Sequence, residues 1–265
     1  MATLQAPPSV RLRANPRLTT GLLAVSGFVV LWQLAGSTNA VPADLISYPS
    51  QVLDAAVRMA ASGELASNAS VSLLEFAYGF FPALVLGVGL GLLMGLFRRL
   101  RYLLDPLIMA LYTPPQFTLL PLLVIWFGIG LESKVAMVFL GALFPIVVNT
   151  STGVQQVDPL LVRAVRAFGG SQLDVVRTVI LPGSLPSMMA GIRLGIGRAI
   201  IGVVVGEMYV AVAGLGHLVQ VYSSATRPAE LIVLVMVFAL FGLVAVNVAR
   251  GIEERVGGWR QSLEV

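Results

Sequence analysis

The chain has 265 residues, of which 57% are hydrophobic and only 11% are charged, and its mean hydropathy is +0.89. A soluble domain carries about 25% charged residues, so the composition excludes an ordinary water-soluble enzyme. The chain contains no cysteine, which excludes a disulfide framework, a zinc–cysteine site and a thiolate nucleophile. This composition indicates a protein embedded in a membrane.

Apolar runs long enough to cross a membrane occur six times. A hydrocarbon core of about 30 Å needs roughly 20 helical residues, whereas strands of a membrane β-barrel are about ten residues long and alternate apolar with polar residues. The runs do not follow the barrel pattern, which predicts an all-α polytopic membrane protein with six transmembrane helices. The predicted spans are Leu18–Gly36, Val71–Phe97, Pro106–Gly130, Val135–Thr152, Ala190–Leu215 and Leu231–Ala249.

The basic residues predict the orientation, because cytoplasmic loops carry an excess of arginine and lysine. Six spans with both termini in the cytoplasm place all but three of the 17 basic residues inside; Arg58, Lys134 and Arg227 face outward, with Lys134 in an outer loop. The predicted regions are a cytoplasmic tail (1–17), the first span (18–36), an outer segment (37–70), a five-span core (71–249) containing a cytoplasmic region (153–189), and a cytoplasmic tail (250–265).

Two interpretations of the N-terminus compete. Thr38-Asn39-Ala40 resembles a signal-peptide cleavage site, but the apolar run of residues 18–36 is longer than a signal core of about 7–15 residues, which favours a retained anchor. In the following outer segment, Ser50 to Ser62 are expected to form an amphipathic helix, either on the outer membrane surface or, as we favour, packed on the spans with no function of its own. Its expected apolar stripe comprises Val52, Leu53, Ala56, Val57 and Ala60, with Asp54 and Arg58 paired on the other side.

Pro114, Pro115 and Pro121 break the third span, because each interrupts the helix and frees backbone carbonyls. Such carbonyls are tolerated at membrane depth only beside protein or a water-filled cavity. The polar residues around them are therefore candidates for lining a translocation path, and a kink that only shapes helix packing is the alternative. The candidates are Tyr112, Thr113, Gln116 and Thr118, with Asn149 and Thr150 on span four as weaker ones.

Two short helices are expected between spans four and five. Asp158 caps a helix that begins at Pro159 and ends at Gly169-Gly170. The next begins after Ser171, forms a capping box with Asp174, and runs to Leu181-Pro182. Each is too short to cross a membrane, so each needs a partner surface, either the spans or another protein.

This segment resembles a known signature. It reads Arg163-Ala164-Val165, three residues, Gly169, nine residues and Val179-Ile180-Leu181-Pro182, which is similar to the E-A-A, three residues, G, nine residues, I-x-L-P signature of permease subunits of binding-protein-dependent ABC (ATP-binding cassette) importers. Further stretches resemble the nitrate, sulfonate and taurine branch, over about Leu45 to Arg255. They are Asp105-Pro106-Leu107, residues 121–130, Ser133-Lys134, Asn149-Thr150 and Gly206-Glu207-Met208.

The resemblance implies a type I ABC importer permease fold and several partner chains. It implies a second permease copy, as a homodimer or a heterodimer with a paralogue, ATPase subunits that bind Mg-ATP, and a periplasmic or lipid-anchored substrate-binding protein. Arg163 replaces the glutamate of the signature, so a contact made by that carboxylate does not carry over. The implied ATPase-docking residues of the coupling helix are Arg163, Ala164, Ala167, Phe168, Gly169, Gly170 and Asp174.

The residues themselves also indicate that the ATPase is a separate chain. A phosphate-binding loop of the form G-x-x-x-x-G-K-[ST] needs a lysine after glycine, and the only lysine, Lys134, follows Ser133. A lone histidine, His217, without cysteine does not make a metal site. We expect a non-catalytic chain that binds no cofactor or metal and no nucleic acid, lies in the inner membrane in contact with lipid, and leaves Mg-ATP to its partner.

Glu207 lies within the predicted fifth span. A carboxylate there is costly unless it is paired, hydrated or protonated, so it is a candidate for the translocation path or for gating. The alternative is that it reaches the outer water. Small residues at four-residue spacing let helix backbones approach closely, and we expect this of Gly87, Gly91 and Gly95 on span two and of Gly191 and Gly195 on span five.

The leading interpretation is the channel subunit of an ATP-driven importer that moves a small solute by alternating access. The resemblance favours an aliphatic sulfonate, taurine or nitrate-like anion, and other members of the same branch handle heterocyclic vitamin precursors or aromatic acids. One alternative is a secondary transporter that needs no ATPase; such proteins often show two repeated halves with broken helices, and only the third span is strongly broken here. A less favoured alternative is an intramembrane enzyme, although an H-E-x-x-H motif is impossible with one histidine.

Overall fold

The computed structural model describes residues 16–37 and 47–257, and every element within them is helical. The predicted all-α class is therefore confirmed. In chain order the elements are α1 (Pro16–Ser37), α2 (Pro49–Ala61), α3 (Glu64–Leu96), α4 (Arg98–Tyr112), the 3-10 turn η1 (Gln116–Leu119), α5 (Leu120–Phe127), α6 (Leu131–Gln155), α7 (Pro159–Ala167), α8 (Gln172–Val175), the π-helical segment η2 (Val176–Ile180), α9 (Leu181–Val210), α10 (Leu215–Ser224) and α11 (Pro228–Gly257).

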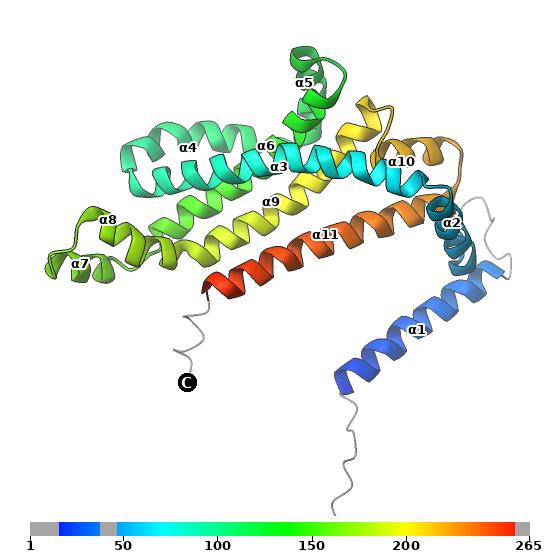
Figure 1. The fold of residues 1–265 in the computed structure, drawn as a ribbon, viewed down its shortest axis with the longest axis horizontal. Coiled ribbons are helices and arrows are strands. Elements are labelled where there is room, and N and C mark those ends of the chain that lie inside the picture. Colours follow the sequence, from blue (N-terminus) through cyan, green and yellow to red (C-terminus); the bar gives the residue numbers. More distant parts are fainter. Residues whose placement is uncertain (1–15, 38–46, 258–265) are drawn as a thin grey trace, which may run out of the picture.

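The centre of the molecule is α6, which packs along α3 and α9, while α11 covers α9 (Figure 1). Val138, Ala142 and Ile146 of α6 are fully buried and meet core side chains from α3, α9 and α11. The helices α7 and α8 lie at one end of this bundle, which we name the α7 end. The helices α2 and α10 lie at the other, the α10 end (Figure 1).

Glycine allows α3 to approach α6 closely. A Cβ atom on Gly87 would lie 2.8 Å from Cγ2 of Ile146, and one on Gly91 would lie 2.6 Å from Cβ of Thr150. Gly95 faces Val154 in the same way, and Gly191 and Gly195 of α9 face Asn149 and Ile146. The structure therefore confirms that these glycines serve close helix packing.

Gly91→Val should destabilise the bundle, because its side chain would also meet the carbonyl oxygen of Val147, 2.8 Å from the Cβ position. Overpacking of this kind costs about 1–3 kcal/mol. Gly89→Val is the matched control, since nothing lies within 4 Å of its Cβ position on the same helix. The measurement is the midpoint of thermal unfolding in detergent, and equal midpoints for the two variants would contradict the packing argument.

The predicted third span is not one straight helix. Its first helix, α4, begins at Arg98, directly after Phe97. The basic residues Arg98, Arg99 and Arg101, which the prediction placed between spans two and three, therefore lie in the first turns of α4. The chain then turns by 92° between residues 98–112 and 116–127, because Pro114 and Pro115 cannot continue the helix. The pair is a broken span or a re-entrant loop.

Among the described residues, four helices are long and apolar enough to span a membrane, and five if the bent pair counts as one. They are Glu64–Leu96, Leu131–Gln155, Gln172–Val210 and Pro228–Arg255. In α1 the apolar stretch found there, Leu23–Gly36, is shorter. The count of six spans and the cytoplasmic termini stay predictions.

The predicted break at Leu181-Pro182 is wrong. The elements α8, η2 and α9 form one continuous helix over Gln172–Val210. Proline is accommodated because Pro182 lies directly after the π-helical segment Val176–Ile180, where the regular α-helical hydrogen-bond pattern is already interrupted. This helix ends at Val210 rather than at Leu215, which begins α10 instead.

The expected helix of the outer segment is present as α2, but its buried face differs. Val52, Ala55 and Met59 are buried, whereas Leu53 and Val57 are exposed. Arg58 pairs with Glu230 of α11, with 3.4 Å between Nη2 and Oε1, instead of with Asp54. The reason is tertiary: α2 packs against α11 and α3, and α3 already begins at Glu64 within the predicted outer segment.

Candidate functional site

The first part of the candidate site is α7, whose two ends form as the sequence predicts. Asp158 Oδ1 accepts a hydrogen bond from the Leu160 N–H at 2.8 Å and caps the helix. At the other end Gly169 has a φ of +82°, a left-handed conformation that favours glycine, and the Gly170 N–H donates to the Val165 carbonyl at 2.9 Å. These caps set the length of α7 through local hydrogen bonds.

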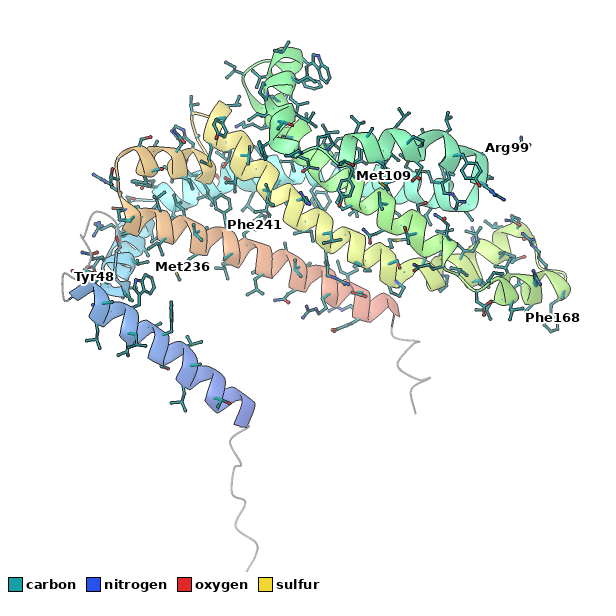
Figure 2. All side chains as sticks on the ribbon, turned by 180° about the vertical axis from the view of Figure 1, so that it is seen from behind. Tyr48, Arg99, Met109, Phe168, Met236 and Phe241 are labelled. Carbon is teal, nitrogen blue, oxygen red and sulfur yellow. The ribbon has the colours of Figure 1, made fainter. Side chains whose placement is uncertain are left out.

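The apolar residues of α7 divide between two faces. Val162 and Val165 pack onto a small core, made by Val154, Val175 and Ile180, at the α7 end. The other face is open: Leu160 and Leu161 are exposed, and Phe168 is 93% exposed. Figure 2 shows the Phe168 side chain projecting from the tip of the molecule. Such a patch of large apolar side chains on a tip marks an interaction surface.

The helix that follows is tied to α7 by polar contacts. Ser171 and Asp174 form the predicted capping box, and the Ser171 N–H donates to Asp174 Oδ2 at 2.8 Å. Arg166 Nη2 donates to Gln172 Oε1 at 2.9 Å across the turn. Arg163, Ala164 and Ala167 are exposed on α7. All the predicted docking residues therefore belong to one small region, the tip formed by α7 and the start of α8.

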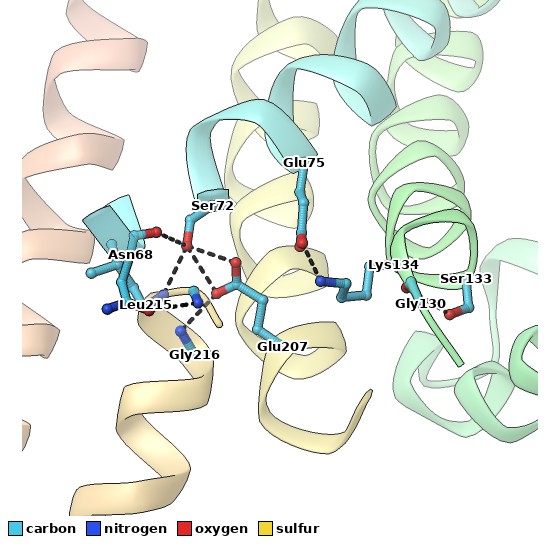
Figure 3. Close-up of polar contacts among 10 residues, drawn as sticks. Asn68, Ser72, Glu75, Gly130, Ser133, Lys134, Glu207, Leu215 and Gly216 are labelled. Atoms are coloured by element: carbon cyan, nitrogen blue, oxygen red, sulfur yellow. Dashed lines mark hydrogen bonds and ion pairs between the residues drawn. The ribbon is translucent and has the colours of Figure 1, made fainter. Parts of the chain in front are cut away.

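The second part is a polar cluster at the α10 end that joins α3, α6, α9 and α10 (Figure 3). Glu75 of α3 and Lys134 of α6 form a buried ion pair. Glu207 of α9 is fully buried, and Ser72 of α3 donates to its carboxylate, with Oγ 2.7 Å from Oε1. Glu207 therefore does not reach the outer water, which corrects that alternative.

The same cluster binds the first turn of α10. Asn68 Oδ1 accepts from the Gly214 N–H at 2.8 Å, Ser72 Oγ from the Leu215 N–H at 2.9 Å, and Glu207 Oε2 from the Gly216 N–H at 2.7 Å (Figure 3). The unpaired N–H groups at a helix start favour a negative charge nearby. Side chains of α3 and α9 thus cap α10, whose own N-cap is Gly214.

The far end of α10 is fixed as well. Tyr222 Oη donates to Glu64 Oε2 of α3 at 2.7 Å. Burial and this neighbouring carboxylate raise the pKa of Tyr222 to about 12, so the phenol keeps the proton that it donates. Both ends of α10 are therefore attached to α3.

The predicted path residues do not form one group. Thr113 and Thr118 are exposed at the bend, where each hydroxyl donates to a backbone carbonyl of its own segment. Gln116 is buried and its Nε2 lies 3.4 Å from the Leu140 carbonyl of α6. The remaining four sit among helices: Tyr112 against Phe144, Asn149 against Gly191, Thr150 buried against Gly91, and Glu207 in the polar cluster.

Sequence reasoning missed most of the polar cluster. Lys134 is a buried residue of α6 and not part of an outer loop, because the helix already begins at Leu131. Glu75, Ser72 and Asn68 are not among the site residues predicted from the sequence. The available signal was a lone glutamate within the apolar run of span two, since an ionisable residue in a span is a candidate for function. The spacing of residues along the chain does not predict which residue pairs with this glutamate.

Known proteins are similar to this chain in sequence and in fold. The model of the family described as "Binding-protein-dependent transport system inner membrane component" matches residues 83–258. The chain belongs to this family. It is therefore a non-catalytic, multi-pass permease subunit of the inner membrane, which works with ATPase and substrate-binding components.

Several curated relatives match the permease over most of their length. It is 31% identical to the putative aliphatic sulfonates transport permease protein SsuC of Bacillus subtilis (strain 168), covering 92% of this chain and 88% of that protein. It is 36% identical to the protein of the same description from Escherichia coli (strain K12), covering 83% of each. With the taurine transport system permease protein TauC of Escherichia coli (strain K12), identity is 30%, and coverage is 93% of this chain and 91% of that protein.

Solved structures share the fold of the permease. A chain of the inward-facing MetNI methionine ABC transporter superposes with a TM-score of 0.52 at 20% identity, covering 69% of this chain and 91% of that one. A chain of an amino acid ABC transporter crystallised with histidines gives a TM-score of 0.50 at 20% identity, covering 69% and 94%. The fold is that of a type I ABC importer permease.

Proposed function

We propose that the permease forms one half of a channel for a small organic or inorganic anion, an aliphatic sulfonate, taurine or a nitrate-like ion. The other half is a second copy of this chain, or a paralogue. Support for the substrate class comes from relatives named for aliphatic sulfonate and taurine transport at 30–36% identity over most of the chain. A substrate-binding protein delivers the anion, and alternating access moves it inward.

The α7 end faces the cytoplasm in this proposal. The basic residues along the chain support that orientation, because Arg163, Arg166 and Arg177 lie on α7 and at the start of the following helix. In contrast, Arg58 lies on α2 and Arg227 directly before α11, both at the α10 end. The α10 end then meets the binding protein outside.

The exposed tip of α7 is the observation that carries the coupling to ATP. Its apolar face has no partner within the part of the chain that the structure describes, and Phe168 is 93% exposed. We assign the docking of an ATPase subunit, which holds Mg-ATP, to this face. Shape provides the contact, through Ala164, Ala167, Phe168, Gly169 and Gly170, while Arg163 presents a positive charge where the family signature has a carboxylate.

Fewer of the predicted residues remain candidates for lining the translocation path. Thr113 and Thr118 are the exposed polar side chains at the bend between α4 and α5, and we assign the translocation path to this bend. Gln116 positions the bend by its contact with the Leu140 carbonyl. Asn149 serves helix packing, since its Nδ2 donates to the Pro145 carbonyl of its own helix at 2.8 Å and its Cβ faces Gly191.

Taurine uptake by proteoliposomes tests the proposed function. Vesicles that contain the permease, its cognate ATPase and the binding protein should accumulate labelled taurine only when ATP is supplied on the ATPase side. Vesicles with the permease alone are the control and should show no taurine-driven counterflow. Counterflow without the ATPase would overturn the proposal in favour of a secondary transporter. ATP-driven uptake of a different kind of solute, with no uptake of taurine, an aliphatic sulfonate or nitrate, would overturn the substrate assignment alone.

A further inference from the structure

We propose that Glu207 is a positioning residue that makes α10 follow α9 when the ATPase moves the α7 end. This inference rests on the proposed function, in which α7 docks the ATPase and α10 lies at the outer mouth. In this mechanism the buried carboxylate of Glu207 converts movement of the α7 end into opening of the α10 end. Three observations carry it.

The first observation is a continuous mechanical element. One helix runs from Gln172 to Val210, 39 residues, and at 1.5 Å per residue it is about 58 Å long. Its first turn begins with the Ser171–Asp174 capping box and is joined to α7 by the hydrogen bond between Arg166 and Gln172. Its last turn carries Glu207. A displacement of α7 therefore reaches Glu207 through a single helix.

The second observation is that α10 has competing attachments. Glu207 of α9 accepts a hydrogen bond from the Gly216 N–H, whereas Asn68 of α3 accepts one from the Gly214 N–H. Ser72 of α3 donates to Glu207 and accepts from the Leu215 N–H. When α9 shifts against α3, some of these bonds must break. Of the three bonds made by the first N–H groups of α10, the one to the Glu207 carboxylate is charge-assisted, and such bonds are roughly twice as strong as neutral ones. The start of α10 therefore follows α9, while its far end stays attached to α3 through Tyr222 and Glu64.

The third observation concerns charge. Glu75 and Lys134 both act electrostatically on Glu207 from α3 and α6, and they form an ion pair with each other. The carboxylate of Glu207 is stabilised by hydrogen bonds from the Ser72 hydroxyl and from the Gly216 N–H at the N-terminus of α10. No larger side chain fits between them, because a Cβ atom on Gly214, whose φ is +116°, would overlap the Glu207 carboxylate. This carboxylate is built into the contact between the two helices.

A unique cysteine provides the test, since the chain has none of its own. Leu218 of α10 is 6% exposed, so Leu218→Cys should react slowly with a membrane-impermeant maleimide added on the α10 side. In the complex with the ATPase, trapping with ATP and vanadate should raise the reaction rate. Adding Glu207→Gln, which keeps the shape but removes the charge, should reduce this nucleotide-dependent rise about tenfold while ATPase co-purification stays unchanged.

Asn68→Ala is the matched control. It removes an attachment of the same α10 turn, but on the α3 side, so the nucleotide-dependent rise should persist or increase. A merely structural role would lower the response in both variants alike. An equal loss with Asn68→Ala, an undiminished rise with Glu207→Gln, or no rise in the Leu218→Cys complex would each overturn the inference. Failure of the unmodified permease to bind the ATPase would instead overturn the proposed function beneath it.

Discussion

Lys134→Met should lower the free energy of unfolding by about 3–5 kcal/mol, the typical cost of removing one partner from a buried ion pair. The lysine side chain is 9% exposed and that of Glu75 is 1% exposed. The substitution keeps the length and the apolar stem of the side chain but leaves the buried carboxyl group of Glu75 without its cationic partner. Its Oε2 atom already lacks a hydrogen-bond partner, so the lost ammonium has no substitute.

The double variant Lys134→Met, Glu75→Leu distinguishes this cause from loss of packing. With both charges gone, most of the stability should return, because replacing a buried pair by apolar residues of similar volume is often neutral or stabilising. Unfolding of the detergent-solubilised permease can be followed by tryptophan fluorescence during heating. If the double variant were as unstable as Lys134→Met, the buried carboxylate would not be the cause.

Phe168→Ala should weaken binding of the ATPase by roughly 30-fold or more, since an aromatic side chain at the centre of an interface contributes about 2–4 kcal/mol. The permease itself should keep its stability, because Phe168 is 93% exposed and makes few contacts within its own chain. The measurement is the affinity of the purified ATPase for the permease in nanodiscs.

Ile129→Ala is the matched control for this experiment. Ile129 is 81% exposed, in the turn that precedes α6 and therefore at the other end of that helix from α7. Its loss should leave ATPase affinity unchanged. Equal affinities for the Phe168→Ala variant and the unmodified permease would remove α7 from the docking site.

The two helix ends in the tip formed by α7 and the start of α8 were predictable from the sequence. Asp158, Gly169 and the Ser171–Asp174 box act through hydrogen bonds within a few residues of each other, so the pattern of residue types specifies them locally. The division of α7 into a packed and an open face was not predictable. It depends on a core contributed by α3, α6 and the following helix, and the helical period alone does not say which apolar side chains meet that core.

The polar cluster shows the opposite case. Glu75 and Lys134 are 59 residues apart in the chain, and Ser72 and Glu207 are 135 apart. Spacing along a helix predicts which residues share a face, but it does not predict which positions of different helices meet. That register depends on the close approach of α3, α6 and α9 at their glycines, and it turned a lysine expected in an outer loop into a buried partner.

The sequence by itself determined the membrane location, the helical class and the caps of α7, because hydropathy and capping are properties of short segments. The glycine spacing also indicated close helix packing. Only the tertiary structure decided that one helix runs unbroken from Gln172 to Val210 and that Glu207 bonds to α10. Those features follow from contacts between distant segments, which form only when the helices pack together.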